Sequence, residues 1–118
     1  MTPSLDDLYQ VLRTWALSQK IDTYLSLSNE YKQLTGDWFE PYGSWDVPLG
    51  ALNQRLHVVG APAISALVVK KDTMEPGWAF WGCAPNVLPC PMSDIERLAE
   101  WSKIVKLVHA FAWPGALR

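Results

Sequence analysis

Metal ligands and disulfide-forming residues are scarce in this sequence, which has two cysteines and two histidines among 118 residues. Cys83 and Cys90 lie in a proline-rich segment, and neither His57 nor His109 is close to them in sequence, so we expect no zinc site. In a reducing cytoplasm the two cysteines are expected to remain thiols. The sequence therefore predicts no metal and no other cofactor.

Long hydrophobic runs and a secretory leader are also missing. No apolar run approaches the roughly 18 to 20 residues that span a bilayer. Residues 1–7 are acidic and lack the basic and apolar regions of a signal peptide. We therefore expect a cytoplasmic protein that is not associated with a membrane.

The remaining composition is that of an ordinary globular protein, with 49% hydrophobic and 19% charged residues. We expect a single domain over residues 1–118, because two domains from so short a chain would each have too small a core. The formal net charge is −2, and no dense basic stripe is present. Such a stripe is what binding to nucleic-acid phosphates requires, so the charge counts against that function class.

Catalytic motifs are missing as well. The sequence has no glycine-rich phosphate loop, no Gly-x-Ser-x-Gly elbow, no His-Glu-x-x-His and no Cys-x-x-Cys. Cys83 with His109 as its base is one conceivable pair, but any small chain that contains a cysteine and a histidine offers it. No reaction follows from these residues, and we expect a non-enzymatic protein.

Three helices are predicted in the first half of the chain. Ser4 is the expected N-cap of the first helix. The second runs from near residue 22 to 35, where Gly36 ends it. The third begins at Pro48, which suits the first helical position, and ends at Gly60.

The second half of the chain predicts a β-hairpin followed by a long helix. Residues 63–69 are apolar on both alternating faces, as in a central strand, and residues 78–81 form the return strand after the polar turn 70–77. The last helix, from the Ser93 cap to about residue 112, has a broad apolar face that we expect to be buried on more than one side. This order predicts an α+β fold with the element order of a winged-helix domain. Six residues are expected to meet in one core: Leu52, Leu56, Leu67, Val69, Val105 and Val108.

Aromatic residues are unusually frequent, with seven tryptophans, four tyrosines and three phenylalanines. Four of the tryptophans, Trp38, Trp45, Trp78 and Trp81, lie at loop or strand positions, and tryptophan is enriched in interface hot spots. The acids Asp37, Glu40 and Asp46 flank these rings and favour a partner with basic groups. The alternative is that the rings close the core. The predicted partner-binding residues are Trp38, Phe39, Glu40, Tyr42, Trp45, Trp78 and Trp81.

A DNA-binding regulator of winged-helix type is the alternative function. The third helix would carry Asn53 and Arg55 on its solvent-facing side, where they would contact base edges, and the wing would carry Lys70 and Lys71. Arg55 is the only strong base on that helix, and a solvated polar face explains these residues equally well.

One segment resembles a recurring pattern in other proteins. Leu49-Gly50-Ala51-Leu52-Asn53, then Gly60-Ala61-Pro62-Ala63-Ile64-Ser65-Ala66-Leu67-Val68-Val69, then Lys71-x-Thr73-x-x-Pro76-Gly77-x-Ala79-Phe80 resembles a segment of bacterial and phage proteins of unassigned function. Some of these proteins carry an HNH-type nuclease module beside the segment. The similarity covers about residues 48–81, and Trp78-Ala79 stands where glycines are usual. This chain lacks an HNH signature, so the resemblance implies no nuclease residues and no reaction.

The resemblance implies a phage or mobile-element setting, and hence host defence or counter-defence. Together with the aromatic loop it leads us to expect a protein-binding inhibitor or adaptor, similar in role to anti-CRISPR proteins. The expected partner is a host or defence-system protein, in particular one that handles nucleic acid, and a homodimer is compatible with the sequence.

Overall fold

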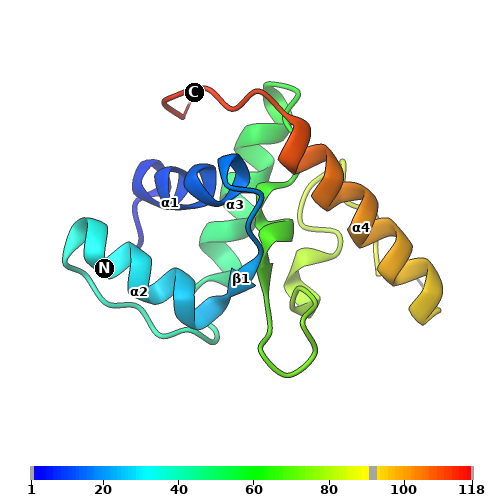
Figure 1. Ribbon diagram of the computed structural model, residues 1–118, viewed down its shortest axis with the longest axis horizontal. Helices are drawn as coiled ribbons and strands as arrows, with labels where there is room; N and C mark the ends of the chain where they lie inside the picture. Colours follow the sequence, from blue (N-terminus) through cyan, green and yellow to red (C-terminus); the bar gives the residue numbers. More distant parts are fainter. Residues whose placement is uncertain (1, 91–92, 118) are drawn as a thin grey trace.

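A computed structural model describes residues 2–90 and 93–117, and this part of the chain contains four α-helices and a small two-stranded sheet (Figure 1). The mixed α and β composition expected from the sequence is therefore present. The elements, in chain order, are α1 (Leu5–Leu17), β1 (Asp22–Thr23), α2 (Tyr24–Thr35), α3 (Asp46–Val58), the 3₁₀ helix η1 (Ile64–Leu67), β2 (Val68–Val69), the 3₁₀ helix η2 (Trp78–Phe80) and α4 (Asp94–Ala110).

The helix ends follow the local capping chemistry. The Ser4 hydroxyl accepts a hydrogen bond from the backbone N–H of Asp7 (3.3 Å), and the Ser93 hydroxyl accepts one from Glu96 (3.1 Å). Gly36 ends α2 with a φ of 85°, a left-handed conformation in which a side chain would be strained. The predicted caps Ser4, Gly36 and Ser93 are confirmed, because each depends on residues within one helical turn. The predicted start of the third helix at Pro48 is wrong, because α3 already begins at Asp46.

The predicted β-hairpin is wrong. β2 pairs with β1 in parallel, Asp22 opposite Val68 and Thr23 opposite Val69, and these are the only strands within residues 2–90 and 93–117. The expected return strand is η2, closed by short-range hydrogen bonds such as that from the N–H of Trp81 to the carbonyl of Trp78 (3.2 Å). The winged-helix element order is therefore not confirmed.

Side chains take the place of neighbouring strands around the buried segment 63–67. The N–H of Ser65 donates to Oδ1 of Asn53 (3.3 Å), and the carbonyl of Ala66 accepts from the indole N–H of Trp101 (2.9 Å). A buried backbone needs partners of this kind, and here two helices supply them. The apolar composition of the segment therefore reflects its burial, since only Val68 and Val69 form a strand.

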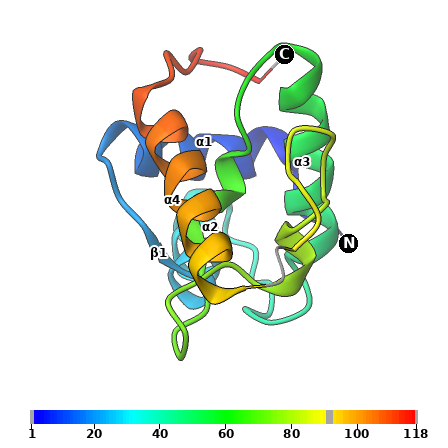
Figure 2. The same ribbon diagram turned by 90° about the vertical axis from the view of Figure 1, so that its right-hand side faces the viewer.

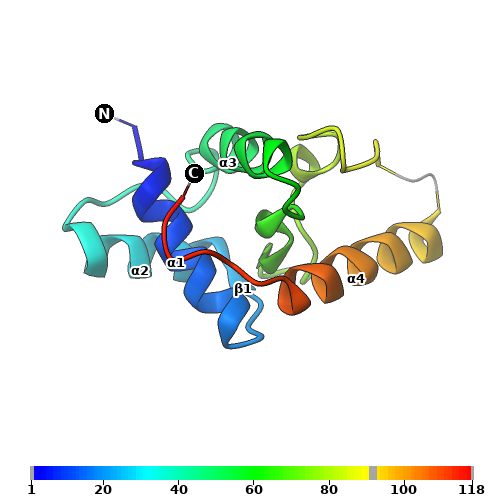
Figure 3. The same ribbon diagram turned by 90° about the horizontal axis from the view of Figure 1, so that it is seen from above.

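The core lies around η1, which contacts α1, α3 and α4, and around β2, which contacts β1 and α2 (Figures 2 and 3). Large side chains of α1 and α2 complete it. The predicted core is confirmed for five of its six residues: Leu52, Leu56, Leu67, Val105 and Val108 belong to one buried cluster, whereas Val69 is buried outside it.

Helix α4 is less buried than its sequence predicts. Ile104, Val105 and Val108 are buried, whereas Ile95 is 82% exposed and Leu107 about half exposed. Figure 2 shows that the outer face of α4 has no neighbouring element, so burial on more than one side is wrong for the described residues. No helix in the described part of the chain is both long and apolar enough to cross a lipid bilayer.

Candidate functional site

The loop 36–46 exposes two of the predicted binding rings. Trp38 is 42% and Tyr42 64% exposed. The indole N–H of Trp38 donates to Oε1 of the exposed Glu40 (3.4 Å), and Nζ of Lys32 lies 5.9 Å from the centroid of the Trp38 ring. The expectation that Trp38, Glu40 and Tyr42 lie at the surface is confirmed.

The other two aromatic residues of this loop turn inward. Trp45 is fully buried, and its indole N–H donates to the hydroxyl of Ser28 (2.9 Å). The rings of Trp45, Phe39 and Tyr31 meet edge to face, with centroids 5.3–5.6 Å apart. The predicted exposure of Trp45 is wrong because the loop folds back over α2, which offers both an apolar surface and a hydrogen-bond acceptor. Phe39 is half-buried.

The turn 70–77 and the residues after it form a second aromatic surface. Trp78 is 73% exposed, and Trp81 is half-buried. Between these rings and the side chains of Lys70 and Arg97 lies a cleft of about 340 Å³. Trp78 is thus exposed as predicted, whereas Trp81 is half-buried and lines the cleft.

The turn is closed by its own backbone. The N–H of Lys70 donates to the carbonyl of Glu75 (2.8 Å), and the N–H of Met74 donates to the carbonyl of Lys70 (2.8 Å). Met74 has a φ of 56° and an exposed side chain. A positive φ is uncommon for a residue other than glycine, so the surrounding hydrogen bonds hold Met74 at the tip of the turn.

Two contacts anchor the turn to the helices. Nε of Arg97 donates to Oε1 of Glu75 (2.7 Å), and the N–H of Gly77 donates to the hydroxyl of Tyr24 (3.2 Å). A side chain at Gly77 would meet that hydroxyl at 3.1 Å, so glycine suits this close approach. The ring of Tyr24 also contacts that of Tyr42, at 6.3 Å between centroids, which brings the loop 36–46 beside the turn.

We call the exposed side chains of Tyr42, Lys71, Met74 and Trp78 the turn surface. Tyr42 and Lys71 line one shared depression on it, and Trp78 lines the neighbouring cleft. Sequence reasoning identified Tyr42 and Trp78 as candidates but missed Met74. No local signal marks a methionine that adopts a left-handed conformation, since glycine and asparagine are the usual residues there.

The residues proposed for nucleic-acid contact do not come together. Asn53 is fully buried, and its Nδ2 donates to the hydroxyl of Ser65 (2.5 Å), so its predicted solvent-facing position is wrong. Arg55 is exposed near the C-terminal end of α3. Lys70 and Lys71 lie on the turn 70–77. This turn and the C-terminal end of α3 are at opposite ends of the molecule (Figures 1 and 2).

The cysteine considered as a nucleophile is in a structural environment. Cys83 is half-buried, and Nδ2 of Asn53 lies 3.2 Å from its Sγ. Burial raises the pKa of the Cys83 thiol, which disfavours the thiolate, the form that acts as a nucleophile. Nε2 of His109 lies 3.5 Å from the backbone oxygen of Lys20. Within residues 2–90 and 93–117 no three His, Cys, Asp or Glu side chains are grouped to hold a metal ion.

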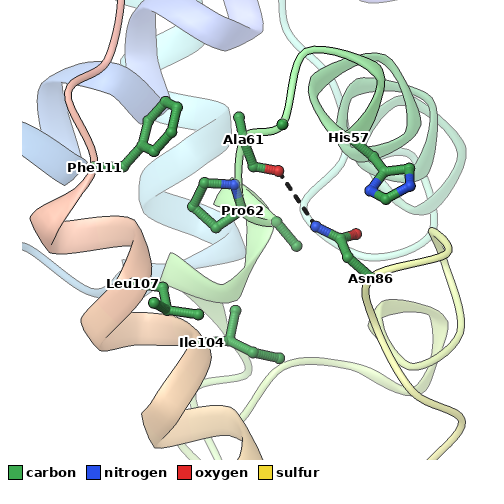
Figure 4. Close-up of a pocket in the computed structure, with 9 residues that line it drawn as sticks. His57, Ala61, Pro62, Asn86, Ile104, Leu107 and Phe111 are labelled. Carbon is green, nitrogen blue, oxygen red and sulfur yellow. Dashed lines mark hydrogen bonds between the residues drawn. The ribbon is translucent and has the colours of Figure 1, made fainter.

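An apolar pocket of about 420 Å³ lies between the end of α3 and the C-terminal half of α4 (Figure 4). His57 and Asn86 occupy one wall, and Nδ2 of Asn86 donates to the carbonyl of Ala61 (3.3 Å). The opposite wall is formed by Ile104, Leu107 and Phe111. Among the described residues that line it, His57 is the only one with a titratable side chain. This pocket therefore offers no acid–base pair for catalysis.

Comparison of the chain with protein-family models, with curated proteins and with solved structures finds no match.

Proposed function

We propose that this chain is a non-enzymatic protein-binding module of phage or mobile-element origin that acts in the bacterial cytoplasm as an inhibitor or adaptor of a host defence protein. The observation that supports it best is the indole of Trp78, which is 73% exposed and directly follows a turn that is anchored to α2 and α4. Tryptophan, tyrosine and methionine are all enriched in protein interfaces, and the turn surface presents one of each.

The rigidity of the turn favours binding over a merely solvated loop. Hydrogen bonds from Gly77 to Tyr24 and from Arg97 to Glu75 fix the backbone that carries Trp78. Little conformational freedom would therefore be lost when a partner covers the ring. Removing a buried tryptophan anchor from an interface typically costs about 2 kcal/mol or more of binding free energy.

The charges around the turn favour a protein partner over nucleic acid. Lys70 and Lys71 are accompanied by Asp72 and Glu75 in the same short segment, so the turn carries both signs. A phosphate backbone attracts a surface of predominantly positive charge. The alternative DNA-binding regulator also loses Asn53 as a contact for base edges, because that side chain is buried.

The proposal is tested by phage plating on a panel of bacterial strains that each carry one nuclease-based defence system. We expect expression of the wild-type chain to raise plating efficiency on at least one strain. The defence protein of that strain should then co-elute with the purified chain in size-exclusion chromatography. Trp78→Ala should abolish both effects while leaving the thermal unfolding midpoint unchanged.

Val58→Ala is the matched control, since Val58 is also strongly exposed but lies at the end of α3, away from the turn. It should behave like wild type in plating and co-elution. Wild-type chain without effect on any strain would reject a role in counter-defence. Undiminished activity of Trp78→Ala would reject the turn surface as the binding site.

A further inference from the structure

A second apolar pocket, of about 570 Å³, lies on another side of the loop 36–46. Its volume falls within the range of pockets that hold a small ligand or a large side chain. Residues before and in the first turn of α1, the loop and the start of α3 all contribute to it. Its apolar walls are formed by Pro3, Leu5, Phe39, Val47, Pro48 and Ala51. We call it the N-terminal pocket.

The walls of the N-terminal pocket are held in place by the core. Phe39 packs edge to face against Trp45 and Tyr31, so the ring on the pocket wall is fixed. Val47 is 80% exposed in the first turn of α3, which makes it an apolar group at the surface of the protein. The pocket is therefore preformed, and an apolar group that enters it covers side chains that now contact water.

The segments that build this pocket carry acids and, up to Arg13 and Arg55, no basic residue. Residues 2–12 and 36–54 contain five acids, Asp6, Asp7, Asp37, Glu40 and Asp46, and no Lys, Arg or His. Three of these acids are exposed and directly follow or precede a residue of the pocket wall: Asp6 follows Leu5, Glu40 follows Phe39, and Asp46 precedes Val47. The nearby base Lys32 lies against the ring of Trp38.

We propose that the N-terminal pocket binds a large apolar side chain from a segment of the partner protein in which lysine or arginine flanks that side chain. The apolar walls select the side chain, and the exposed acids select the positive flanks. Nucleic acid would be repelled by the same acids. Basic segments are characteristic of proteins that handle nucleic acid. The inference rests on the proposed function and specifies the sequence character of one segment of the partner protein.

The test is an NMR titration of the ¹⁵N-labelled full chain with three acetylated and amidated hexapeptides. The first, Lys-Lys-Leu-Phe-Lys-Lys, has both the apolar anchor and the basic flanks. Lys-Lys-Ser-Ser-Lys-Lys lacks the anchor, and Glu-Glu-Leu-Phe-Glu-Glu reverses the charge. At low salt, we expect the first peptide to bind about tenfold more tightly than either of the others, with amide shifts at Phe39, Gly43, Val47 and Ala51. Raising the salt to about 0.15 M should weaken it.

Two variants assign the binding to this pocket. Ala51→Phe places a ring in the pocket and should weaken the first peptide about tenfold, whereas Ala99→Phe, an equal enlargement at an exposed position of α4, should not. The double variant Glu40→Gln/Asp46→Asn should reduce the preference for basic over acidic flanks while the preference for the apolar anchor remains.

Equal binding of all three peptides, no binding of any, or shifts confined to other residues would overturn the inference. The inference would also be overturned if, without any peptide, the amide shifts of the pocket residues changed with protein concentration. A second copy of the chain would then be the occupant of the pocket. These outcomes leave the proposed function untouched if Trp78→Ala still abolishes defence inhibition. Conversely, specific binding of the first peptide together with no effect in any plating assay would reject the proposed function. The N-terminal pocket would then still be a binding site for an apolar side chain with basic flanks.

Discussion

The indole N–H of Trp45 donates a hydrogen bond to the hydroxyl of Ser28 across 2.9 Å, and both side chains are fully buried. This bond joins the residue before α3 to the middle of α2. Replacing Trp45 with Phe keeps a ring but removes the donor. We expect the free energy of unfolding to fall by about 1 to 3 kcal/mol, because the Ser28 hydroxyl loses its partner and a smaller ring leaves space. Urea denaturation measures the loss.

A double-mutant cycle with Ser28→Ala isolates the hydrogen bond. Ser28→Ala leaves the indole N–H buried without its partner, so the double variant should cost less than the sum of the two single variants. Trp38→Phe is the control, since Trp38 is at the surface, and it should change stability by about 0.5 kcal/mol or less. Strict additivity of the two buried substitutions would contradict the importance of this bond.

Leu67 is fully buried in η1, at the centre of the core. Leu67→Ala should lower the free energy of unfolding by ~2 to 5 kcal/mol, because it removes buried apolar surface and leaves a cavity between packed helices. Leu34→Ala, at an exposed position of α2, is the matched control and should cost far less. A loss below about 1 kcal/mol for Leu67→Ala, in chemical denaturation, would contradict the central position of η1.

Local signals in the sequence predicted the parts of the fold that depend on local interactions. The caps at Ser4 and Ser93 and the left-handed Gly36 each involve residues within one turn of helix. The apolar stripe containing Leu52 and Leu56 likewise predicted most of the buried side of α3, although it left out Asn53. These features required no knowledge of what packs against them.

The errors arose where a distant partner decides the conformation. Residues 63–69 have a strand-like composition, but the amide of Asn53 and the indole of Trp101 satisfy their backbone and leave only a two-residue strand. Trp45 lies in a polar loop and is buried because the loop folds over α2, where Tyr31 packs against its ring and Ser28 accepts its N–H. In the candidate site, Trp38, Tyr42 and Trp78 are exposed as predicted, whereas the N-terminal pocket needs three segments that no local pattern brings together.

Burial raises the pKa of the Cys83 thiol in the folded protein above its value in the unfolded chain. This difference determines how the stability of the protein changes with pH. As the pH rises, the thiol of the unfolded chain loses its proton first, at about pH 8.5. The contribution of the protonated Cys83 thiol to the free energy of unfolding is therefore complete below that pH, and it is lost as the pH rises through the pKa of the folded protein. Wild-type stability should therefore decline at alkaline pH more steeply than that of Cys83→Ala. Equal slopes for the two proteins in denaturation series at increasing pH would contradict this.

The reactivity of Cys83 provides an independent measurement. In the Cys90→Ser variant, Cys83 is the remaining cysteine, and its alkylation by iodoacetamide at neutral pH can be followed alone. We expect the native protein to react at least about tenfold more slowly than the urea-unfolded protein, because the thiolate is the reactive form and the fold disfavours it. Equal rates would place Cys83 in an open, reactive environment.

Asn53 forms the hydrogen bonds that hold α3 to η1, and its substitution should affect stability but not nucleic-acid recognition. Its Nδ2 donates to the Ser65 hydroxyl (2.5 Å), and its Oδ1 accepts from the Ser65 backbone N–H (3.3 Å). Asn53→Ala leaves both Ser65 groups without these partners in a buried position, at about 1 to 3 kcal/mol each, so we expect a total loss of ~2 to 6 kcal/mol. Asn29→Ala, at an exposed position of α2, should be nearly neutral. If Asn53→Ala instead kept its unfolding free energy but altered binding to duplex DNA in a gel-shift assay, Asn53 would be a base-reading residue and the DNA-binding alternative would be favoured.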